Sequence, residues 1–301
     1  MSSAIETHGL TRRFGRTAAV DGLTLTVPEG SIYAFLGPNG AGKTTTIKML
    51  LNILRPTSGS AGILGVESTR LGPREFAQIG YVSENQQQPE WMTVSQLIAY
   101  CRPMYPTWDD AFCGKLLQGF DLPPDRKLRS LSRGMKMKAA LLTSLAYRPR
   151  LLVLDEPFTG LDPLVRDEVI RGMLELTEQE KWTVFVSSHD IDEVERLADW
   201  VGVINAGKIQ LAESADSLQS RFRRLECVVG DGARVPSSSP KSWMGAEITG
   251  HGLRVVETQY EAGPSENRLL EAFPGASQVS ASEMSLREVF LALAKTFRLK
   301  S

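Results

Sequence analysis

The sequence has few cysteines and no long apolar run. Its three cysteines, Cys101, Cys113 and Cys227, lack the paired spacing of a zinc site, and such a sparse, odd set is typical of a reducing compartment. No stretch approaches about 18 uninterrupted apolar residues. The N-terminus lacks the basic start and apolar core of a signal peptide. We therefore expect a protein that does not span a bilayer, so that any role at a membrane acts through a partner.

An excess of charge of either sign is also lacking. The chain has 34 Lys and Arg against 35 Asp and Glu, a net charge of −1. Bulk charge therefore favours neither nucleic acid nor an anionic membrane surface as a partner. With 301 residues and no evident internal repeat or heptad run, the chain is long enough for one large or two modest domains with proper cores.

The most informative segment is a glycine-rich loop at residues 37–45, Gly-Pro-Asn-Gly-Ala-Gly-Lys-Thr-Thr. It fits the phosphate-loop pattern G-x-x-x-x-G-K-[ST], with an apolar run at 32–36 before it and helical apolar spacing after it. The glycines allow several backbone N–H groups to point at one phosphate, and the start of the helix adds its positive dipole end. We expect Lys43 to reach the β- and γ-phosphates and the Thr44 hydroxyl to hold Mg²⁺.

A second apolar run, at 151–154, ends in the acid pair Asp155 and Glu156. The run predicts a central parallel strand buried on both faces. Two acids at its end carry a desolvation cost unless a cation or a positioned water is present. Beside a phosphate loop, we expect Asp155 to bind Mg²⁺, directly or through water, and Glu156 to orient and deprotonate a water. The plainer interpretation is two surface acids that cap the next helix.

A third apolar run, at 182–186, leads to Ser187-Ser188-His189-Asp190. A lone histidine is more often structural than catalytic. Ligands gather, however, where parallel strands end, and this strand would end beside the glycine loop and the acid pair. That placement favours a functional role for His189.

Two groups of aromatic residues have more than one interpretation. From its own segment, beside a glycine turn, we expect Phe14 to be part of the core. Residues from about 86 to 148 have helical patterns interrupted by prolines, which predicts an inserted helical subdomain. Its aromatic residues either fill that subdomain's core or line a docking surface; they are Trp91, Tyr100, Tyr105 and Trp108.

Taken together, the motifs resemble the nucleotide-binding subunit of an ABC transporter over roughly residues 4 to 225. In chain order they are GPNGAGKTT, LSRGMK, LLVLDEP, TGLD and SSHD. The resemblance implies an α/β fold with a P-loop NTPase (RecA-like) core, an N-terminal antiparallel β subdomain and an inserted helical subdomain at about 86–148. It implies an ATPase domain over 1–225. Residues 226–301 are then a small C-terminal α+β accessory domain of unknown role.

The resemblance also implies a role for individual residues. Phe14 stacks on adenine, which replaces the expectation of a core residue. Ser132 and Gly134 contact the γ-phosphate of ATP held by an opposite subunit, and Asp162 couples the two sites. Thr44, Glu84 and Asp155 support Mg²⁺, while Lys43, Glu156 as general base and His189 are catalytic. The residues that wrap the phosphates are Gly37, Pro38, Asn39, Gly40, Ala41, Gly42, Lys43, Thr44 and Thr45.

Three positions depart from the family pattern: Arg133 replaces a usual Gly, Met135 a usual Gln and Glu84 a usual Gln. Such variants resemble bacterial ABC-2 type exporters whose membrane subunits are separate chains. The implied protein hydrolyses ATP with Mg²⁺, forms a homodimer, and binds a membrane permease at the cytoplasmic face of a bacterial membrane. Its cargo would be a small molecule, lipid or peptide. The alternative is a soluble ABC ATPase with a translation, repair or regulatory role.

Overall fold

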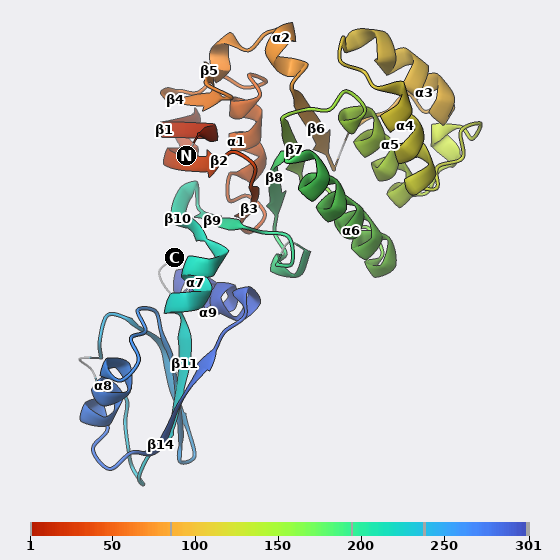
Figure 1. The fold of residues 1–301 in the computed structure, drawn as a ribbon. Helices are drawn as coiled ribbons and strands as arrows, with labels where there is room; N and C mark the ends of the chain where they lie inside the picture. The colour runs from red at the N-terminus through yellow and green to blue at the C-terminus, as the bar shows by residue number, and fades with distance from the viewer. Residues whose placement is uncertain (1, 85, 194, 237–238, 299–301) are drawn as a thin grey trace. The chain divides into compact units, whose positions relative to one another are not determined.

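The computed structural model describes residues 2–84, 86–193, 195–236 and 239–298, without the side chains of 176, 178, 179 and 295–298. The chain divides into two compact units, Met1–Ala212 and Glu213–Ser301. Figure 1 shows the helices and strands of each unit.

The first unit is built around a six-stranded sheet with the order β10-β9-β3-β8-β7-β6. Five neighbouring strands, β6, β7, β8, β3 and β9, pair in parallel. All residues of β3, β7 and β8 are buried, which explains their unbroken apolar runs. Because the strands are parallel, their carboxyl ends meet at one edge of the sheet. The strands are β3 (Ile32–Leu36), β6 (Ile79–Ser83), β7 (Leu151–Asp155), β8 (Thr183–Ser188), β9 (Trp200–Asn205) and β10 (Lys208–Ser214).

A second, antiparallel sheet packs beside it with the order β2-β1-β4-β5. Along β2, Leu23, Leu25 and Val27 are buried while Thr24 and Thr26 are exposed, so the alternation seen in the sequence marks the inner face. Residues of both sheets and of α1 (Lys43–Leu50) share one hydrophobic core. The strands are β1 (Ser3–Phe14), β2 (Thr17–Pro28), β4 (Ser58–Ile63) and β5 (Val66–Glu67), followed by η1 (Ser68–Arg70) and α2 (Pro73–Phe76).

A helical segment lies between β6 and β7 in the chain. Its helices begin at capping residues: Thr93 before α3, Asp109 before α4 and Ser132 before α5, each accepting a backbone N–H of the first turn. The helices are α3 (Val94–Cys101), η2 (Arg102–Met104), α4 (Asp110–Gly119), η3 (Leu128–Ser130) and α5 (Arg133–Leu145). After β7, α6 (Pro163–Glu180) leads back to the sheet, and η4 (Ile191–Glu193) follows β8.

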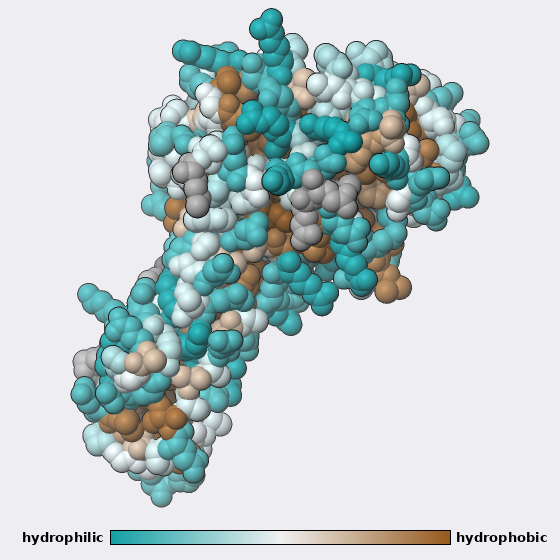
Figure 2. All heavy atoms as spheres, viewed as in Figure 1, coloured by the Kyte–Doolittle hydropathy of each residue, from teal (hydrophilic) through white to brown (hydrophobic). Residues whose placement is uncertain are grey.

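The aromatic residues of this segment divide between the two expected roles. The rings of Tyr105 and Tyr147 stack with centroids 3.7 Å apart, and Trp108 lies beside Tyr105. By contrast, Trp91 is 66% exposed and Tyr100 is 53% exposed. Tyr105 and Trp108 are therefore partly buried against other rings, whereas Trp91 and Tyr100 lie at the surface, where a docking role stays a prediction. Figure 2 shows hydrophobic residues scattered among hydrophilic ones on the face that it displays.

The second unit has a core of its own beneath a sheet with the order β12-β13-β11-β14. The three strand pairs are antiparallel. Leu225, Val255 and Leu269 are fully or almost fully buried in that core. Its elements are α7 (Ala215–Arg221), β11 (Arg223–Val228), β12 (Trp243–Thr249), β13 (Gly252–Glu257), α8 (Pro264–Ala272), β14 (Ser277–Glu283) and α9 (Leu286–Arg298). Within the described parts of both units, no helix is long and apolar enough to cross a membrane.

Candidate active site

The glycine loop is held at the carboxyl end of β3 by very close backbone contacts. A Cβ on Gly37 would lie 2.3 Å from the carbonyl oxygen of Ile204, and a Cβ on Gly42 would lie 2.5 Å from that of Ala19. Gly42 also has a φ of 111° where it caps α1. Only glycine fits both positions. The loop crest at Pro38, Asn39 and Gly40 is exposed, so its backbone is open to a ligand.

Lys43 is buried and bends back over its own loop. Its Nζ donates to the carbonyl oxygens of Gly37 at 2.5 Å and Pro38 at 3.2 Å. The same Nζ lies 3.0 Å from Oε1 of Glu156. The charge that we expect to meet a phosphate is therefore engaged by three oxygen atoms of the protein.

Asp155 is the last residue of β7 and is only 5% exposed. Its Oδ1 accepts hydrogen bonds from the hydroxyl groups of Thr44 at 3.1 Å and Ser187 at 2.8 Å. Burial raises the pKa of the Asp155 carboxyl, although the hydroxyl donors act in the opposite direction. A buried carboxylate held by neutral donors fits a cation, because a bound cation would offset its desolvation.

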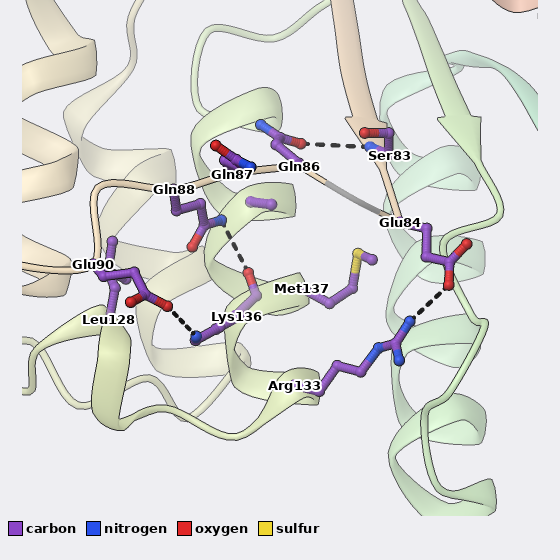
Figure 3. A pocket seen from close by; sticks show the side chains of 11 residues that line it. Ser83, Glu84, Gln86, Gln87, Gln88, Glu90, Leu128, Arg133, Lys136 and Met137 are labelled. Atoms are coloured by element: carbon purple, nitrogen blue, oxygen red, sulfur yellow. Dashed lines mark hydrogen bonds and ion pairs between the residues drawn. The ribbon is translucent and has the colours of Figure 1, made fainter. Parts of the chain in front are cut away.

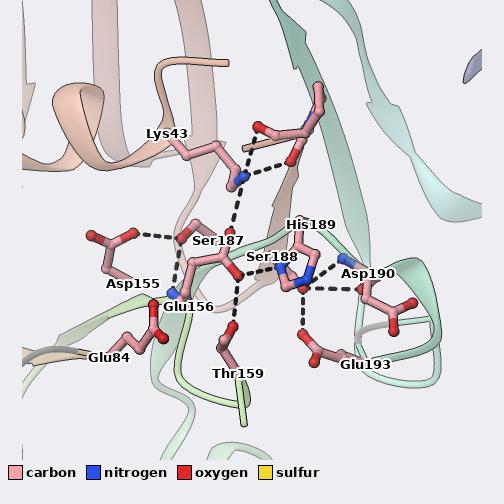
Figure 4. Close-up of polar contacts among 12 residues, drawn as sticks. Lys43, Glu84, Asp155, Glu156, Thr159, Ser187, Ser188, His189, Asp190 and Glu193 are labelled. Atoms are coloured by element: carbon pink, nitrogen blue, oxygen red, sulfur yellow. Dashed lines mark hydrogen bonds and ion pairs between the residues drawn. The ribbon is translucent and has the colours of Figure 1, made fainter. Parts of the chain in front are cut away.

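Glu156 takes part in the densest set of contacts at the site (Figure 4). Its Oε2 lies 2.7 Å from Nδ1 of His189 and accepts from the Thr159 hydroxyl at 3.1 Å. Its Oε1 meets Lys43 as an ion pair, but no atom of the described chain gives it a well-oriented hydrogen bond. Burial acts to raise the pKa of Glu156, but contacts with His189 and Lys43 outweigh it and hold the pKa below its usual value.

The backbone of Glu156 is in the left-handed region, with a φ of 52°. For a residue that is not glycine this costs roughly 1–3 kcal/mol and persists only where neighbours hold it. Here the Glu156 amide donates to the carbonyl oxygen of Ser187 at 3.2 Å and to its Oγ at 3.1 Å. Ser187 thus orients both acids, a role that we did not assign from the sequence.

Behind His189 lies a buried carboxylate that sequence reasoning also missed. Glu193 is 3% exposed and accepts a short hydrogen bond from the hydroxyl of Ser188. Nη1 of Arg166, on α6, lies 3.7 Å from Oε1 of Glu193. Burial raises the pKa of Glu193. The only signal in the sequence was the polar run that follows β8, in which no residue singles out Glu193.

The helical segment reaches the site at Glu84 and Arg133. The amide of Glu84 donates to the carbonyl oxygen of Asp155 at 2.9 Å, which places Glu84 beside the acid pair. Its Oε1 accepts from Nη2 of Arg133 at 2.9 Å. Figure 3 shows both at one end of a cavity of about 620 Å³. The cavity is lined by Ser83, Glu84, Gln86, Gln87, Gln88, Glu90, Leu128, Arg133, Lys136, Met137 and Ala140.

The structure thus joins Lys43, Thr44, Asp155, Glu156 and His189 in one set of contacts. The residues predicted to contact the ATP of a second subunit lie outside this set of contacts. Ser132 and Asp162 accept backbone N–H groups where they cap α5 and α6. A Cβ on Gly134 would lie 2.6 Å from Cγ1 of Val165, so the starts of these two helices are tightly packed.

Phe14 ends β1 with half of its surface, 51%, exposed. The expectation of a core residue, drawn from its own segment, is therefore wrong. The guanidinium carbon of Arg12 lies 4.7 Å from the centre of the ring, and an Nη1 hydrogen of Arg12 is donated to the carbonyl oxygen of Arg55 at 2.8 Å. A tethered cation thus lies over part of the exposed ring.

The expected metal ligands are all oxygen donors, which Mg²⁺ prefers, and Mg²⁺ commonly takes only one or two carboxylates besides phosphates and water. Thr44 and Asp155 are in direct contact, and Glu84 adjoins Asp155 through the backbone. Among the described residues, no group of three or more His, Cys, Asp or Glu side chains could hold a metal ion. Ligation by Thr44, Glu84 and Asp155 therefore stays a prediction.

Comparison with known proteins gives a consistent result. The family model described as ABC transporter matches residues 20–159, and an AAA-domain model matches 124–195. The bacitracin transport ATP-binding protein BcrA of Bacillus licheniformis is 35% identical over 77% of this chain and 76% of its own. The daunorubicin/doxorubicin resistance ATP-binding protein DrrA of Streptomyces peucetius is 37% identical over 74% of this chain and 70% of its own. BcrA of Enterococcus faecalis is 28% identical and covers 96% of both chains.

Solved structures agree on the fold. The ATP-binding subunit of an ABC transporter aligns with a TM-score of 0.65 at 25% identity, covering 72% of this chain and 92% of that one. An ATP-binding cassette solved as a dimer in a post-hydrolysis state with ADP and Pi aligns with a TM-score of 0.61 at 20% identity, covering 70% of this chain and 98% of that one. These likenesses confirm the predicted α/β fold of a phosphate-loop ATPase.

Proposed function

Because this chain belongs to the ABC transporter family as an ATP-binding subunit with ATPase activity, we propose that it powers a separate membrane permease that exports a small molecule, lipid or peptide. Two relatives are named for bacitracin transport and for daunorubicin/doxorubicin resistance. The names of these relatives support the export role, and the contact of Lys43 and His189 with Glu156 beside an exposed glycine loop carries the proposed hydrolysis that would power it.

The glycine loop and Lys43 bind the phosphates of ATP. Lys43 is now held by two carbonyl oxygens and Glu156. A triphosphate offers it more negative charge than these partners do, so Lys43 turns to the phosphates and releases Glu156. The freed Glu156 takes the proton of the attacking water, and His189, which contacts the same carboxylate, orients that water and the γ-phosphate.

Thr44, Asp155 and Glu84 would hold Mg²⁺, a role supported by the hydrogen bond of Thr44 to Asp155 and by the backbone contact of Glu84 with Asp155. When bound, Mg²⁺ would neutralise charge on the phosphates. Phe14 offers a half-exposed ring for stacking on adenine. Each of these roles is carried by a side chain that the fold brings to one end of the parallel strands or to the exposed end of β1.

Ser132, Gly134 and Asp162 act on the ATP of a second copy. They lie at the starts of α5 and α6, and Ser132 and Asp162 are engaged in capping their own helices. Two copies placed face to face would bring these helix starts to the partner's glycine loop, where N–H groups favour phosphate. The functional unit is then a homodimer that closes on two ATP molecules.

The permease docks on the helical segment, on the cytoplasmic side of the membrane. The cavity of about 620 Å³ lies between the residues after β6 and helix α5, and exposed Trp91 and Tyr100 lie in the same helical segment. Exposed aromatic residues are enriched in protein interfaces. Movement of this segment on ATP binding would thus pass to the permease.

The test is to measure the ATPase activity of the purified chain with and without the membrane protein that co-purifies with it. We expect co-purification and stimulated turnover, both weakened by Trp91→Ala with Tyr100→Ala. Ile53→Ala is the matched control because Ile53 is 59% exposed in the same unit but outside the helical segment. If no membrane protein changes the rate of ATP turnover and the chain binds ribosomes or DNA, the result would instead support the soluble ABC ATPase.

A further inference from the structure

Two of the residues that depart from the ABC pattern contact one another. Nη2 of Arg133 donates to Oε1 of Glu84 at 2.9 Å although the residues are 49 positions apart in the chain. Arg133 is the first residue of α5, and Glu84 directly follows β6. Figure 3 shows the pair at one end of the cavity. The two departures therefore form one structural feature.

Arg133 also lies against the TGLD segment, at Gly160. A Cβ on Gly160 would fall 2.3 Å from Nη1 of Arg133 and 2.6 Å from its Cζ. The guanidinium group therefore rests on the turn that leads to α6, where Gly160 has a φ of 72°. One side chain thus touches both the residue after β6 and the turn before α6.

The local charge explains what this contact achieves. Glu84, Asp155 and Glu156 end or follow the neighbouring strands β6 and β7, and the amide of Glu84 donates to the carbonyl oxygen of Asp155. Lys43 and His189 contact Glu156, whereas Arg133 contacts Glu84. A Glu84 carboxylate with no cation beside it, neither Arg133 nor a bound Mg²⁺, would repel an incoming triphosphate.

We propose that Arg133 is a positioning residue that neutralises Glu84 and holds it, with the turn at Gly160, in the arrangement that accepts ATP. This inference rests on the proposed function of the same site. It assigns Arg133 a role through Glu84 within its own protomer.

The test is a double-mutant cycle read out as ATP affinity. A fluorescent ATP analogue is titrated with Mg²⁺ into the full chain carrying Arg133→Gln, Glu84→Gln or both changes. Because the pair is partly exposed, we expect Arg133→Gln to raise Kd by about 3- to 5-fold at low salt and less at high salt. In the Glu84→Gln background the same change should alter Kd by less than about 2-fold.

The control is a second ion pair in the same cavity. Nζ of Lys136, also on α5, lies 3.1 Å from Oε1 of Glu90. Lys136→Gln and Glu90→Gln should leave Kd unchanged. The inference is wrong if the Arg133→Gln chain binds the ATP analogue with the parental Kd. It is also wrong if Arg133→Gln raises Kd as much in the Glu84→Gln background as in the parent. If Arg133 had only a structural role, Arg133→Gln would lower Tm, and its effect on Kd would persist in the Glu84→Gln background.

Gly160→Ala provides a second variant, because its methyl group would displace the guanidinium. We expect it to raise Kd about as much as Arg133→Gln does. Gly65→Ala is matched for backbone strain, with a φ of 79° and no described atom within 4 Å of the added Cβ, so it should leave Kd unchanged. If Gly160→Ala binds like Gly65→Ala, the contact with the turn has no role.

Two comparisons separate this inference from the proposed function. A parent chain that binds no ATP overturns both. The inference alone is overturned if the parent binds ATP, Lys43→Ala abolishes that binding, and the changes at Arg133 leave Kd unaltered.

Discussion

The Nζ of Lys43 lies 3.0 Å from Oε1 of Glu156. The cation expected to bind phosphate and the carboxylate expected to activate water are therefore paired with one another. Each must change partner before ATP can react. Glu156 is further held by His189 and Thr159 on its other oxygen. The arrangement keeps a buried carboxylate compensated until a nucleotide arrives.

Glu156→Gln should reduce ATP hydrolysis by about 10² to 10⁴, the usual value of general-base help. The amide cannot take a proton from water, but it keeps the shape of the site. Hydrolysis is measured by phosphate release, and binding by titration with an ATP analogue, which should still bind. Turnover at the parental rate would show that Glu156 is not the base.

Asp155→Asn should raise Tm in the absence of nucleotide and abolish the extra stabilisation by Mg²⁺ with ATP. Burial raises the pKa of Asp155 in the folded chain above its ordinary value of 3.8. A raised folded pKa contributes stability below the unfolded pKa, and that stability is lost as pH rises through the folded pKa. At pH 7 the parent therefore carries the whole cost of the ionised, buried carboxylate.

The gain in Tm from Asp155→Asn should accordingly be larger at pH 7 than at lower pH. For a unit of this size, about 1 kcal/mol corresponds to roughly 2–4 °C. Asp125→Asn, at an exposed position of the helical segment, should show no such trend. A gain that shrinks as the pH rises would contradict the role of burial.

Tyr33→Phe should leave stability unchanged or raise it by about 1 kcal/mol. Tyr33 is fully buried, and its hydroxyl has no hydrogen-bond partner within the described chain. The same hydroxyl would lie 2.5 Å from a Cβ on Gly202. Gly202→Ala should therefore destabilise by roughly 1–3 kcal/mol, and by less in the Tyr33→Phe background.

Thermal unfolding of the single and double variants checks this prediction. Gly114→Ala, in α4, serves as the control because no described atom lies within 4 Å of the added Cβ. It should be neutral or slightly stabilising, since alanine favours a helix. Equal costs for Gly202→Ala in both backgrounds would show that the hydroxyl is not the obstacle.

Phe14→Ala should weaken ATP binding by about 5- to 10-fold, in line with about 1 kcal/mol or more for stacking on a base. Phe14→Tyr should keep most of the affinity because the ring is retained. The measurement is a titration with ATP and with inorganic triphosphate, which has no base. Phe76→Ala removes another exposed ring, on α2, and should have no effect; a loss equal for both ligands would argue against stacking.

Much of the architecture follows from local patterns. The unbroken apolar runs at 32–36, 151–154 and 182–186 became buried parallel strands, because a strand covered on both faces has no polar side. The glycine loop became the start of α1 at the end of β3, because its glycines allow the tight turn that the pattern requires. These effects act within a few residues, so a sequence alone is enough to predict them.

The sequence by itself thus determined the phosphate loop, the strand ends that carry Asp155, Glu156 and His189, and the family to which they point. Only the tertiary structure decided that Lys43 contacts Glu156, that Arg133 contacts both Glu84 and the turn at Gly160, and that Arg12 lies over the ring of Phe14. The reason is physical: a side chain's partner depends on which distant segments the packing brings within hydrogen-bond distance. The same arginine or phenylalanine in the same local pattern is compatible with several such neighbourhoods.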